Sequence, residues 1–328
     1  MNLSIVTTLY NSSRYVLEFH RRISAAAQRL TSDFELVFVN DGSPDDSLAV
    51  AQRLCLADPR VKVIDLSRNY GHHRAMMSGI RHAVGARVFL IDVDLEELPE
   101  ALTEFWACME ADPEVDVVVG QLEAKTVPLL KRMTSDTFYK VFNALSPTKI
   151  SDRDIVSRIM NRAYVDALCD YGEREIFFPA VWVDVGFRQR RIVATKTYDG
   201  HSTYTLRKKV VMAVDAITSF SSSPLVYIFY LGLFFSVGAA LFIAYLVTRK
   251  ILGGHVFLGW TSLMAVLFFI GGIIIFSIGV VGIYVSKIFM EVKGRPQTLV
   301  RRVYDGSLVA DRPSEPIIEQ LLCSPSSG

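Results

Sequence analysis

An acidic segment, DVDLEELPE, directly follows a short apolar run and carries carboxylates at alternate positions. Asp92, Asp94 and Glu96 are separated by single residues. Because alternate residues of an extended segment face the same way, this spacing predicts that the three carboxylates converge. Carboxylate oxygens suit Mg²⁺ or Mn²⁺, and Mg²⁺ commonly shares its shell with substrate phosphates. The pattern predicts a divalent cation beside a phosphate-bearing substrate; a simple acidic turn before a helix at Pro99 is the alternative.

The elements that must position these carboxylates follow from an alternation of short apolar runs with amphipathic stretches. The apolar runs cover residues 3–9, 34–40, 61–66, 86–92 and 115–120. Such alternation predicts an α/β domain with a mostly parallel sheet covered on both faces. Ligands of such sheets bind beyond the carboxyl ends of the strands, where polar segments such as Asn40-Asp41-Gly42-Ser43 stand. The chain has no GxGxxG and no GxxxxGK[ST], which argues against a dinucleotide site and a P-loop.

Two long segments near the C-terminus contain no charged residue. They cover residues 225–247 and 260–286, and each exceeds the ~30 Å hydrocarbon core of a bilayer when helical. They predict a two-helix transmembrane hairpin, with two buried helices of a soluble core as the alternative. Basic residues flank the pair on its outer ends, so the positive-inside rule predicts a multi-pass protein of the cytoplasmic (inner) membrane. Both termini and the α/β domain would then lie in the cytoplasm.

The composition narrows the classes of function. Hydrophobic residues make up 51% of the 328 residues, and the net charge of +1 argues against a nucleic-acid binder. The four cysteines form no CxxC pair, which excludes a disulfide scaffold and a cysteine-based zinc site. We expect an α/β domain over 1–205, an amphipathic interfacial helix over 206–223, two membrane helices within 224–288 and a cytoplasmic tail over 289–328. Glycines in the second span permit close contact between helices, which would allow a homo-oligomer, a dimer or a tetramer.

Ordered motifs then suggest a family. VTTLYNSS, VNDGSPDDS, LSRNYGHHRAMMSGI, DVDLEELPE, VGFRQ and EVKGRP succeed one another over about residues 3 to 304. With them the chain resembles family-2 glycosyltransferases of the GT-A fold, and within these the polyprenyl-phosphate glycosyltransferases. The resemblance implies a Rossmann-like GT-A domain and a metal-dependent, inverting hexosyltransferase. It would move a sugar from a nucleotide sugar to a polyprenyl phosphate, with undecaprenyl phosphate expected, for modification of a cell-envelope glycan or glycolipid.

The resemblance also assigns residues to roles. Thr8, Tyr10, Asn11 and Asp41 would surround the nucleotide, although Asp41 also suits an Asx-type turn before Gly42. In the acidic segment, Asp92 would lie near the ribose or the sugar, Asp94 would hold the metal on the diphosphate, and Glu96 would be a further metal ligand. Asp92 and Asp94 are therefore the expected catalytic residues.

One departure from the family concerns the general base. Val156-Ser157 stand where relatives carry Asp-Phe, and Asp154 is the expected catalytic substitute, with a loop or capping role as the alternative. A lipid phosphate has a second pKa near ~6, so it is already largely dianionic at pH 7 and needs little help from a base. A second departure is Pro179-Ala180, where relatives often carry Arg-Gly.

The acceptor phosphate requires cations close to the membrane. Arg pairs phosphate in two-point geometry, and ordinary juxtamembrane basic residues attracted to anionic lipid are the alternative. The expected contacts are Lys131, Arg132, Arg158, Arg207 and Lys208. Adjacent His72 and His73 would point apart, so we expect structural or donor-side contacts from them and not metal ligation.

Other functions remain open. The missing Asp is compatible with a catalytically impaired homologue that serves as a membrane scaffold, and a transferase to another lipid acceptor is also possible. A processive polysaccharide synthase is disfavoured because the chain has no QxxRW motif and only two apolar spans.

Overall fold

A mixed sheet forms the centre of the α/β domain in this computed structural model, which describes residues 1–122, 129–173, 177–194, 206–252 and 259–305. Within these residues the sheet has eight strands in the order β7-β5-β6-β4-β1-β2-β3-β8. The strands are β1 Leu3–Leu9, β2 Phe34–Asn40, β3 Val61–Leu66, β4 Arg87–Leu90, β5 Val117–Gln121, β6 Asp154–Asn161, β7 Gln189–Val193 and β8 Val300–Tyr304.

The central strands β4, β1, β2 and β3 are parallel to one another. β6 runs antiparallel between β4 and β5, and β8 runs antiparallel beside β3. The predicted GT-A-like α/β fold with a mostly parallel sheet is therefore confirmed. The predicted bounds of β1, β2 and β3 match the structure, whereas β6, β7 and β8 were not predicted.

Helices cover both faces of the sheet because alternate strand residues point to opposite sides. In β2, Phe34, Leu36 and Phe38 belong to one hydrophobic cluster. Val37 and Val39 belong to the other. The helices α1 Ser13–Gln28, α2 Ser47–Ala57 and α4 Leu102–Ala111, the last preceded by a 3₁₀ turn over Pro99–Ala101, pack on the first face. The helices α3 His72–His82, α6 Arg162–Asp170 and α7 Phe178–Asp184 pack on the second face.

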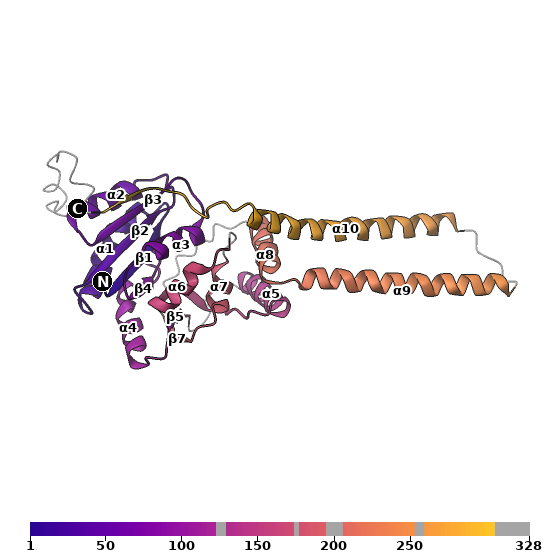
Figure 1. Ribbon diagram of the computed structural model, residues 1–328, viewed down its shortest axis with the longest axis horizontal. Coiled ribbons are helices and arrows are strands. Elements are labelled where there is room, and N and C mark those ends of the chain that lie inside the picture. Colours follow the sequence, from indigo (N-terminus) through magenta and orange to yellow (C-terminus); the bar gives the residue numbers. More distant parts are fainter. Residues whose placement is uncertain (123–128, 174–176, 195–205, 253–258, 306–328) are drawn as a thin grey trace.

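A third, smaller cluster joins this domain to the helices that follow. α5 (Leu129–Leu145) and α8 (Leu206–Phe220) lie between the sheet and the two long helices (Figure 1). Phe142 of α5, Ala180 of α7 and Ala216 of α8 are buried together. The observed α8 matches the position of the predicted interfacial helix, although it ends three residues earlier, at Phe220.

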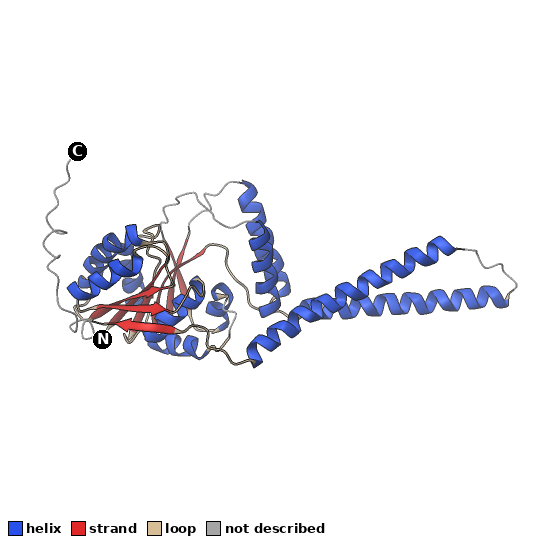
Figure 2. Ribbon diagram, turned by 90° about the horizontal axis from the view of Figure 1, so that it is seen from above, coloured by secondary structure: helices blue, strands red, loops and turns tan. Residues whose placement is uncertain are grey.

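Two long apolar helices leave the domain side by side, as both ribbon views show (Figures 1 and 2). They are α9 Ser223–Ile251 and α10 Trp260–Val292, and the rings of Phe235 and Phe269 meet between them at 5.8 Å. In the described ranges, Phe269–Val292 is long and apolar enough to cross a membrane. A second candidate joins Ala213–Phe220 to Ser223–Ala239 across a bend of 84°. The helix pair exists, and a complete two-helix membrane hairpin stays a prediction.

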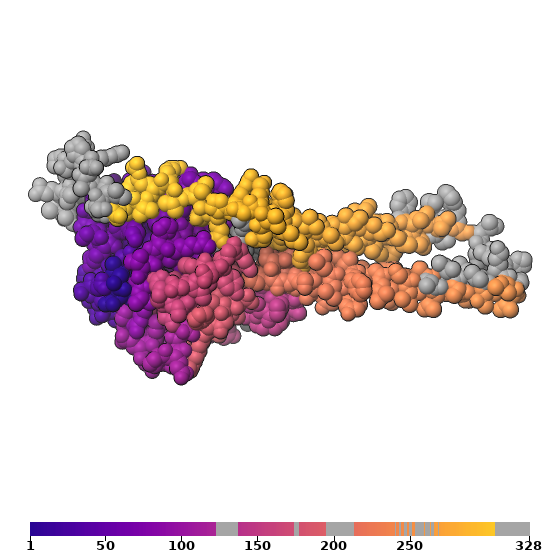
Figure 3. Space-filling model, in the orientation of Figure 1, coloured from indigo at the N-terminus to yellow at the C-terminus, as the bar shows by residue number. Residues whose placement is uncertain are grey.

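The segment after α10 corrects the predicted domain organisation. Residues from 289 onward were expected to form a tail, but Val300–Tyr304 forms β8 at the edge of the sheet. A guanidinium nitrogen (Nη2) of Arg301 donates to the carbonyl of Ser67 at 2.7 Å, and the chain here lies along the domain surface (Figure 3). The α/β domain therefore includes residues beyond both long helices. Residues 195–205 and 306–328 lie outside the described part.

The turn after β2 depends on a glycine. Gly42 has a φ of +61°, which side chains other than glycine rarely adopt. A Cβ at this position would lie 2.5 Å from the backbone nitrogen of Asn69 and 2.6 Å from the carbonyl carbon of Arg68. The end of β2 and the loop after β3 can therefore approach each other only because residue 42 has no side chain.

We expect Gly42→Ala to destabilise the protein by about 1–3 kcal/mol, because it adds both backbone strain and a contact with backbone atoms. The measurement is the thermal unfolding midpoint of the full chain in detergent. Gly172→Ala is the matched control, since a Cβ there meets nothing within 4 Å. Equal midpoints for the two variants would contradict this account of the turn.

Candidate active site

The carboxyl ends of β1, β2, β3 and β4 meet at one edge of the sheet, and most of the predicted donor residues stand there. Thr8 is near the end of β1, Asp41 follows β2, and Asp92 follows β4. We call this the donor edge.

Asp41 joins the end of β2 to the loop that begins α3. It is 3% exposed, and its two carboxylate oxygens accept the backbone N–H groups of Tyr70 at 2.7 Å and Gly71 at 3.0 Å. Burial raises the pKa of Asp41, although these two hydrogen bonds oppose the shift. The carboxylate also lies at the N-terminus of α3, where the helix dipole favours negative charge. Asp41 therefore has a structural role at this edge, whatever ligand it contacts.

His72, the first residue of α3, connects two of the predicted residues. Its Nδ1 lies 3.1 Å from Oγ1 of Thr8, and its Nε2 lies 3.4 Å from Oδ1 of Asp92. The imidazole thus fixes the ends of β1 and β4 relative to each other. The expectation that His72 serves as a structural or donor-side contact agrees with this geometry, but the sequence did not reveal its partners.

Tyr10 and Asn11 lie on the loop between β1 and α1. The Tyr10 side chain is 49% exposed, and the Asn11 amide N–H donates to Oγ of Ser43 at 2.8 Å. Asp45 holds this loop through the Oγ of Ser43 at 2.5 Å and the backbone N–H of Ser13 at 3.0 Å. Burial alone would raise the pKa of Asp45, but hydrogen bonds from Ser43, Ser47 and Ser13 hold it well below its usual range. The loop is therefore ordered by charge-assisted hydrogen bonds.

The acidic segment is not extended, which corrects the predicted convergence of three carboxylates. Leu95 has a φ of +62°, so the chain turns between Asp94 and Glu96 and the alternation of side chains is lost. The backbone N–H of Glu96 donates to Oδ1 of Asp94 at 3.0 Å. In the described ranges, no three His, Cys, Asp or Glu side chains gather closely enough to hold a metal ion. The oxygen donor set still fits Mg²⁺ or Mn²⁺ if substrate phosphates complete the shell.

Glu97, which the sequence did not single out, ties the acidic segment to β6. Its side chain is buried at 2% exposure, and Oε2 accepts the backbone N–H of Ser157 at 3.0 Å and the Ser157 hydroxyl. Ser157 occupies the second of the two positions at which relatives were expected to carry Asp-Phe. This carboxylate–hydroxyl contact could not be read from the sequence because the two residues are 60 positions apart.

Asp154, the expected substitute for a general base, is committed to other partners. Its Oδ1 accepts Nε of Arg191 at 3.0 Å and Nε2 of Gln121 at 3.2 Å, and its Oδ2 accepts Nη2 of Arg191 at 3.1 Å. The structure therefore places Asp154 in an ion pair between β6 and β7. A free carboxylate base was not found at this position.

The predicted acceptor cations fall into two groups. Arg158 is 1% exposed, with its guanidinium carbon 3.0 Å from the centroid of the Trp182 ring and its nitrogens bonded to the carbonyls of Ile155 and Val156. Burial lowers the pKa of Arg158 to about 10. A guanidinium in this position is enclosed by the core and does not reach a lipid. Lys131 and Arg132 belong to α5, and Arg207 and Lys208 belong to α8; their side chains lie outside the described part.

We expect Ser157→Ala to lower the free energy of unfolding by about 1.5–3 kcal/mol, the contribution of a hydrogen bond to a buried charged group. Ser157→Thr retains the hydroxyl and should recover part of the loss. Ser24→Ala is the control, because its buried hydroxyl has no hydrogen-bond partner in the described residues. Thermal unfolding in detergent measures the midpoint of all three variants. Equal midpoints for Ser157→Ala and Ser24→Ala would contradict a stabilising hydrogen bond between Ser157 and Glu97.

Known proteins that are similar to this chain carry the names of glycosyltransferases or of their homologues. A protein of Mycobacterium tuberculosis (strain CDC 1551 / Oshkosh), named as a glycosyltransferase, is 43% identical over 96% of this chain and 92% of its own length. The SfII prophage-derived bactoprenol glucosyl transferase of Shigella flexneri is 29% identical over 94% of this chain and 100% of its own. The prophage bactoprenol glucosyl transferase homolog of Escherichia coli (strain K12) is 30% identical over 92% and 99%.

The family described as "Glycosyl transferase family 2" matches residues 4–169, which include the whole donor edge. The match begins in β1 and ends in α6, so it covers the strands and loops that carry Thr8, Asp41, His72 and Asp92. This chain belongs to glycosyl transferase family 2.

Proposed function

We propose that this protein transfers a sugar from a nucleotide-sugar donor to a membrane polyprenyl phosphate. The product would be a lipid-phosphate-linked sugar for the cell envelope. The observation that carries this proposal is the extent of the similarity: relatives named bactoprenol glucosyl transferases match 92% and 94% of the chain. So long a match must extend through α9 and α10, and a lipid acceptor gives these helices a function.

The donor would bind at the donor edge. Thr8, Tyr10, Asn11 and Asp41 are proposed to surround the nucleotide, with Asp92 near the ribose or the sugar. The Tyr10 ring is exposed and available for stacking. Each Asp41 oxygen already accepts one backbone N–H, and a carboxylate oxygen has a second lone pair that can accept a hydrogen bond from a base.

Asp94, with Glu96, is proposed to hold the divalent cation. When bound, Mg²⁺ or Mn²⁺ would supply positive charge that stabilises the diphosphate as it leaves. The chain contributes orientation: the backbone N–H of Glu96 fixes one oxygen of Asp94. Ser157 anchors the neighbouring Glu97 and thereby limits how far the acidic turn can move.

The acceptor phosphate would attack the anomeric carbon on the face opposite the leaving diphosphate, which inverts that centre. The attacking phosphate is already largely dianionic at pH 7, so the reaction needs no strong base. This agrees with Asp154 being paired to Arg191. We propose that Lys131, Arg132, Arg207 and Lys208 hold the acceptor, because α5 and α8 lie between the α/β domain and the long helices (Figure 1).

The membrane part of the proposal concerns α8, α9 and α10. We propose that α9 and α10 cross the cytoplasmic membrane as a hairpin and that α8 lies on its surface. The large apolar side chains of both long helices are exposed, including Phe234, Phe242 and Phe276. Basic residues precede α9 and follow α10, which favours placing the catalytic domain in the cytoplasm.

Transfer is tested with the full chain in polyprenyl-phosphate proteoliposomes containing Mn²⁺ and radiolabelled UDP-, GDP- or dTDP-sugars. We expect one donor to give an organic-extractable, lipid-linked sugar. Asp94→Ala should reduce this rate by at least about 100-fold, because the leaving group loses its stabilisation. Asp166→Ala is the control, since this aspartate lies exposed on α6.

The outcomes separate the alternatives. Failure of every donor with a folded protein would favour the membrane scaffold over the transferase. Full activity of Asp94→Ala would remove the proposed metal site. Transfer to another lipid, with none to polyprenyl phosphate, would overturn the acceptor assignment alone.

The contacts of His72 give a separate prediction for donor binding. His72→Phe keeps an aromatic ring but loses the contacts with Thr8 and Asp92, so nucleotide affinity or transfer should fall about 10- to 100-fold. His73→Phe is the matched control, because this neighbouring ring packs against Phe178 with centroids 5.5 Å apart. Titration of each variant with the nucleoside diphosphate of the donor that supports transfer measures the nucleotide affinity. Equal losses of affinity in His72→Phe and His73→Phe would contradict the role of His72 as a bridge between Thr8 and Asp92.

A further inference from the structure

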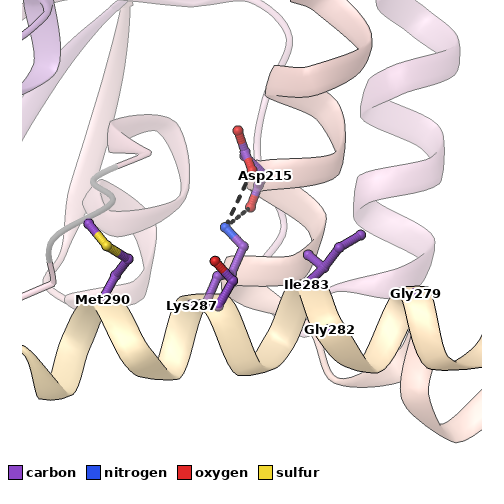
Figure 4. Close-up of a pocket in the computed structure, with 7 residues that line it drawn as sticks. Asp215, Gly279, Gly282, Ile283, Lys287 and Met290 are labelled. Carbon is purple, nitrogen blue, oxygen red and sulfur yellow. Dashed lines mark hydrogen bonds and ion pairs between the residues drawn. The ribbon is translucent and has the colours of Figure 1, made fainter.

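A groove of about 330 Å³ opens between α8 and α10 (Figure 4). Both helices meet close to where the long helices leave the domain (Figure 1). The walls of the groove include Asp215 from α8 and Gly279, Gly282, Ile283, Ser286 and Lys287 from α10. Every wall residue comes from these two helices, and none belongs to the donor edge.

The groove changes in polarity along α10. The residues of α10 that line the groove recur at intervals of three and four positions, so they share one face of that helix. Gly279, Gly282 and Ile283 form an apolar end, whereas Ser286 and Lys287 form a polar end nearer the α/β domain. Met290 follows this polar end as the last lining residue of α10. An amphipathic molecule lying parallel to α10 would match this order.

Two glycines leave the apolar end open. A Cβ built on Gly279 or Gly282 would meet no other atom within 4 Å in the described chain. The space beside both glycines is therefore open. A larger side chain at either position would fill the groove without disturbing a packed neighbour.

Lys287 supplies the charge at the polar end. Its Nζ donates to the carbonyl of Asp215 at 3.2 Å and to Oγ of Ser219 at 3.0 Å. The Asp215 carboxylate is farther away, at 3.6 Å, and is 52% exposed, whereas the Lys287 side chain is 16% exposed. The ammonium is thus held in place by neutral oxygens of α8. Its contact with the exposed Asp215 carboxylate is longer than these two hydrogen bonds, and an anionic oxygen could take the place of that carboxylate.

We propose that this groove binds an anionic phospholipid of the bilayer, with its phosphate at Ser286 and Lys287 and an acyl chain beside Gly279 and Gly282. The proposal rests on the membrane location given under the proposed function. A bilayer lipid is preferred to the sugar acceptor because no donor-edge residue lines the groove. The lipid would fill the space between α8 and α10 and fix the angle at which the domain meets the membrane.

The test uses the full-length protein in a neutral detergent, with phosphatidylglycerol as the probe and native mass spectrometry as the measure of retained lipid. We expect one tightly retained molecule of phosphatidylglycerol and weaker retention of phosphatidylcholine. Lys287→Gln should weaken retention about tenfold, as expected when one charge-assisted hydrogen bond is lost. Gly282→Leu should weaken it similarly with no change in charge.

Lys293→Gln is the matched control, because Lys293 follows the same helix and stacks on Phe289 at 5.1 Å outside the groove. It should retain the lipid as the wild type does. Asp215→Asn should retain it at least as tightly, because the competing carboxylate is removed. If Gly282→Leu fails to fold by circular dichroism, Gly279→Leu replaces it, since that position is equally open.

Several results would overturn the proposal. Equal losses for Lys287→Gln and Lys293→Gln would show general surface attraction. Unchanged retention in the groove-filling variant would exclude the acyl-chain site. Displacement of the lipid by inorganic phosphate would exclude a role for the acyl chain in binding. Displacement by equimolar polyprenyl phosphate would reassign the groove to the sugar acceptor. Because no sugar transfer is measured, loss of the transferase proposal would leave this result standing.

Discussion

The hydrogen bonds from the Tyr70 and Gly71 amides to the Asp41 carboxylate are the contacts on which the donor edge depends. They fix the start of α3, and the next residue, His72, then reaches Thr8 on β1 and Asp92 after β4. A single buried carboxylate therefore sets the relative positions of four strand ends. The absence of a side chain at Gly42 is what lets the β2 and β3 loops approach closely enough.

The same edge is connected to the apolar helices through aromatic side chains. His73 packs against Phe177 and Phe178, and Phe177 contacts Phe142 of α5 and Phe220 of α8. At the edge of the sheet, β8 returns from α10 and pairs with β3. The domain is thus attached to the long helices by two routes, an arrangement that suits the proposed transfer to a lipid acceptor.

The sequence predicted the structure correctly where one local pattern of apolar residues determined it. The runs of β1, β2 and β3 are mostly apolar and contain no arginine, so they predicted the bounds of these strands and the positions of Thr8 and Asp41 at their ends. β6, β7 and β8 were missed because arginines interrupt each of them and because β8 pairs with a strand far away in the sequence. Local pattern also failed at Leu95, whose positive φ turns the acidic segment, and at Asp154 and Arg158, whose partners Arg191 and Trp182 are distant in sequence.

Hydrogen–deuterium exchange of the full chain, with and without a mixture of UDP, GDP and dTDP plus Mn²⁺, tests most directly whether a nucleotide and a divalent cation bind at the donor edge. We expect slower exchange in residues 8–11, 40–43, 69–73 and 92–97, with little change on α9 and α10. Protection elsewhere, with unchanged exchange in these four segments, would contradict binding at the donor edge.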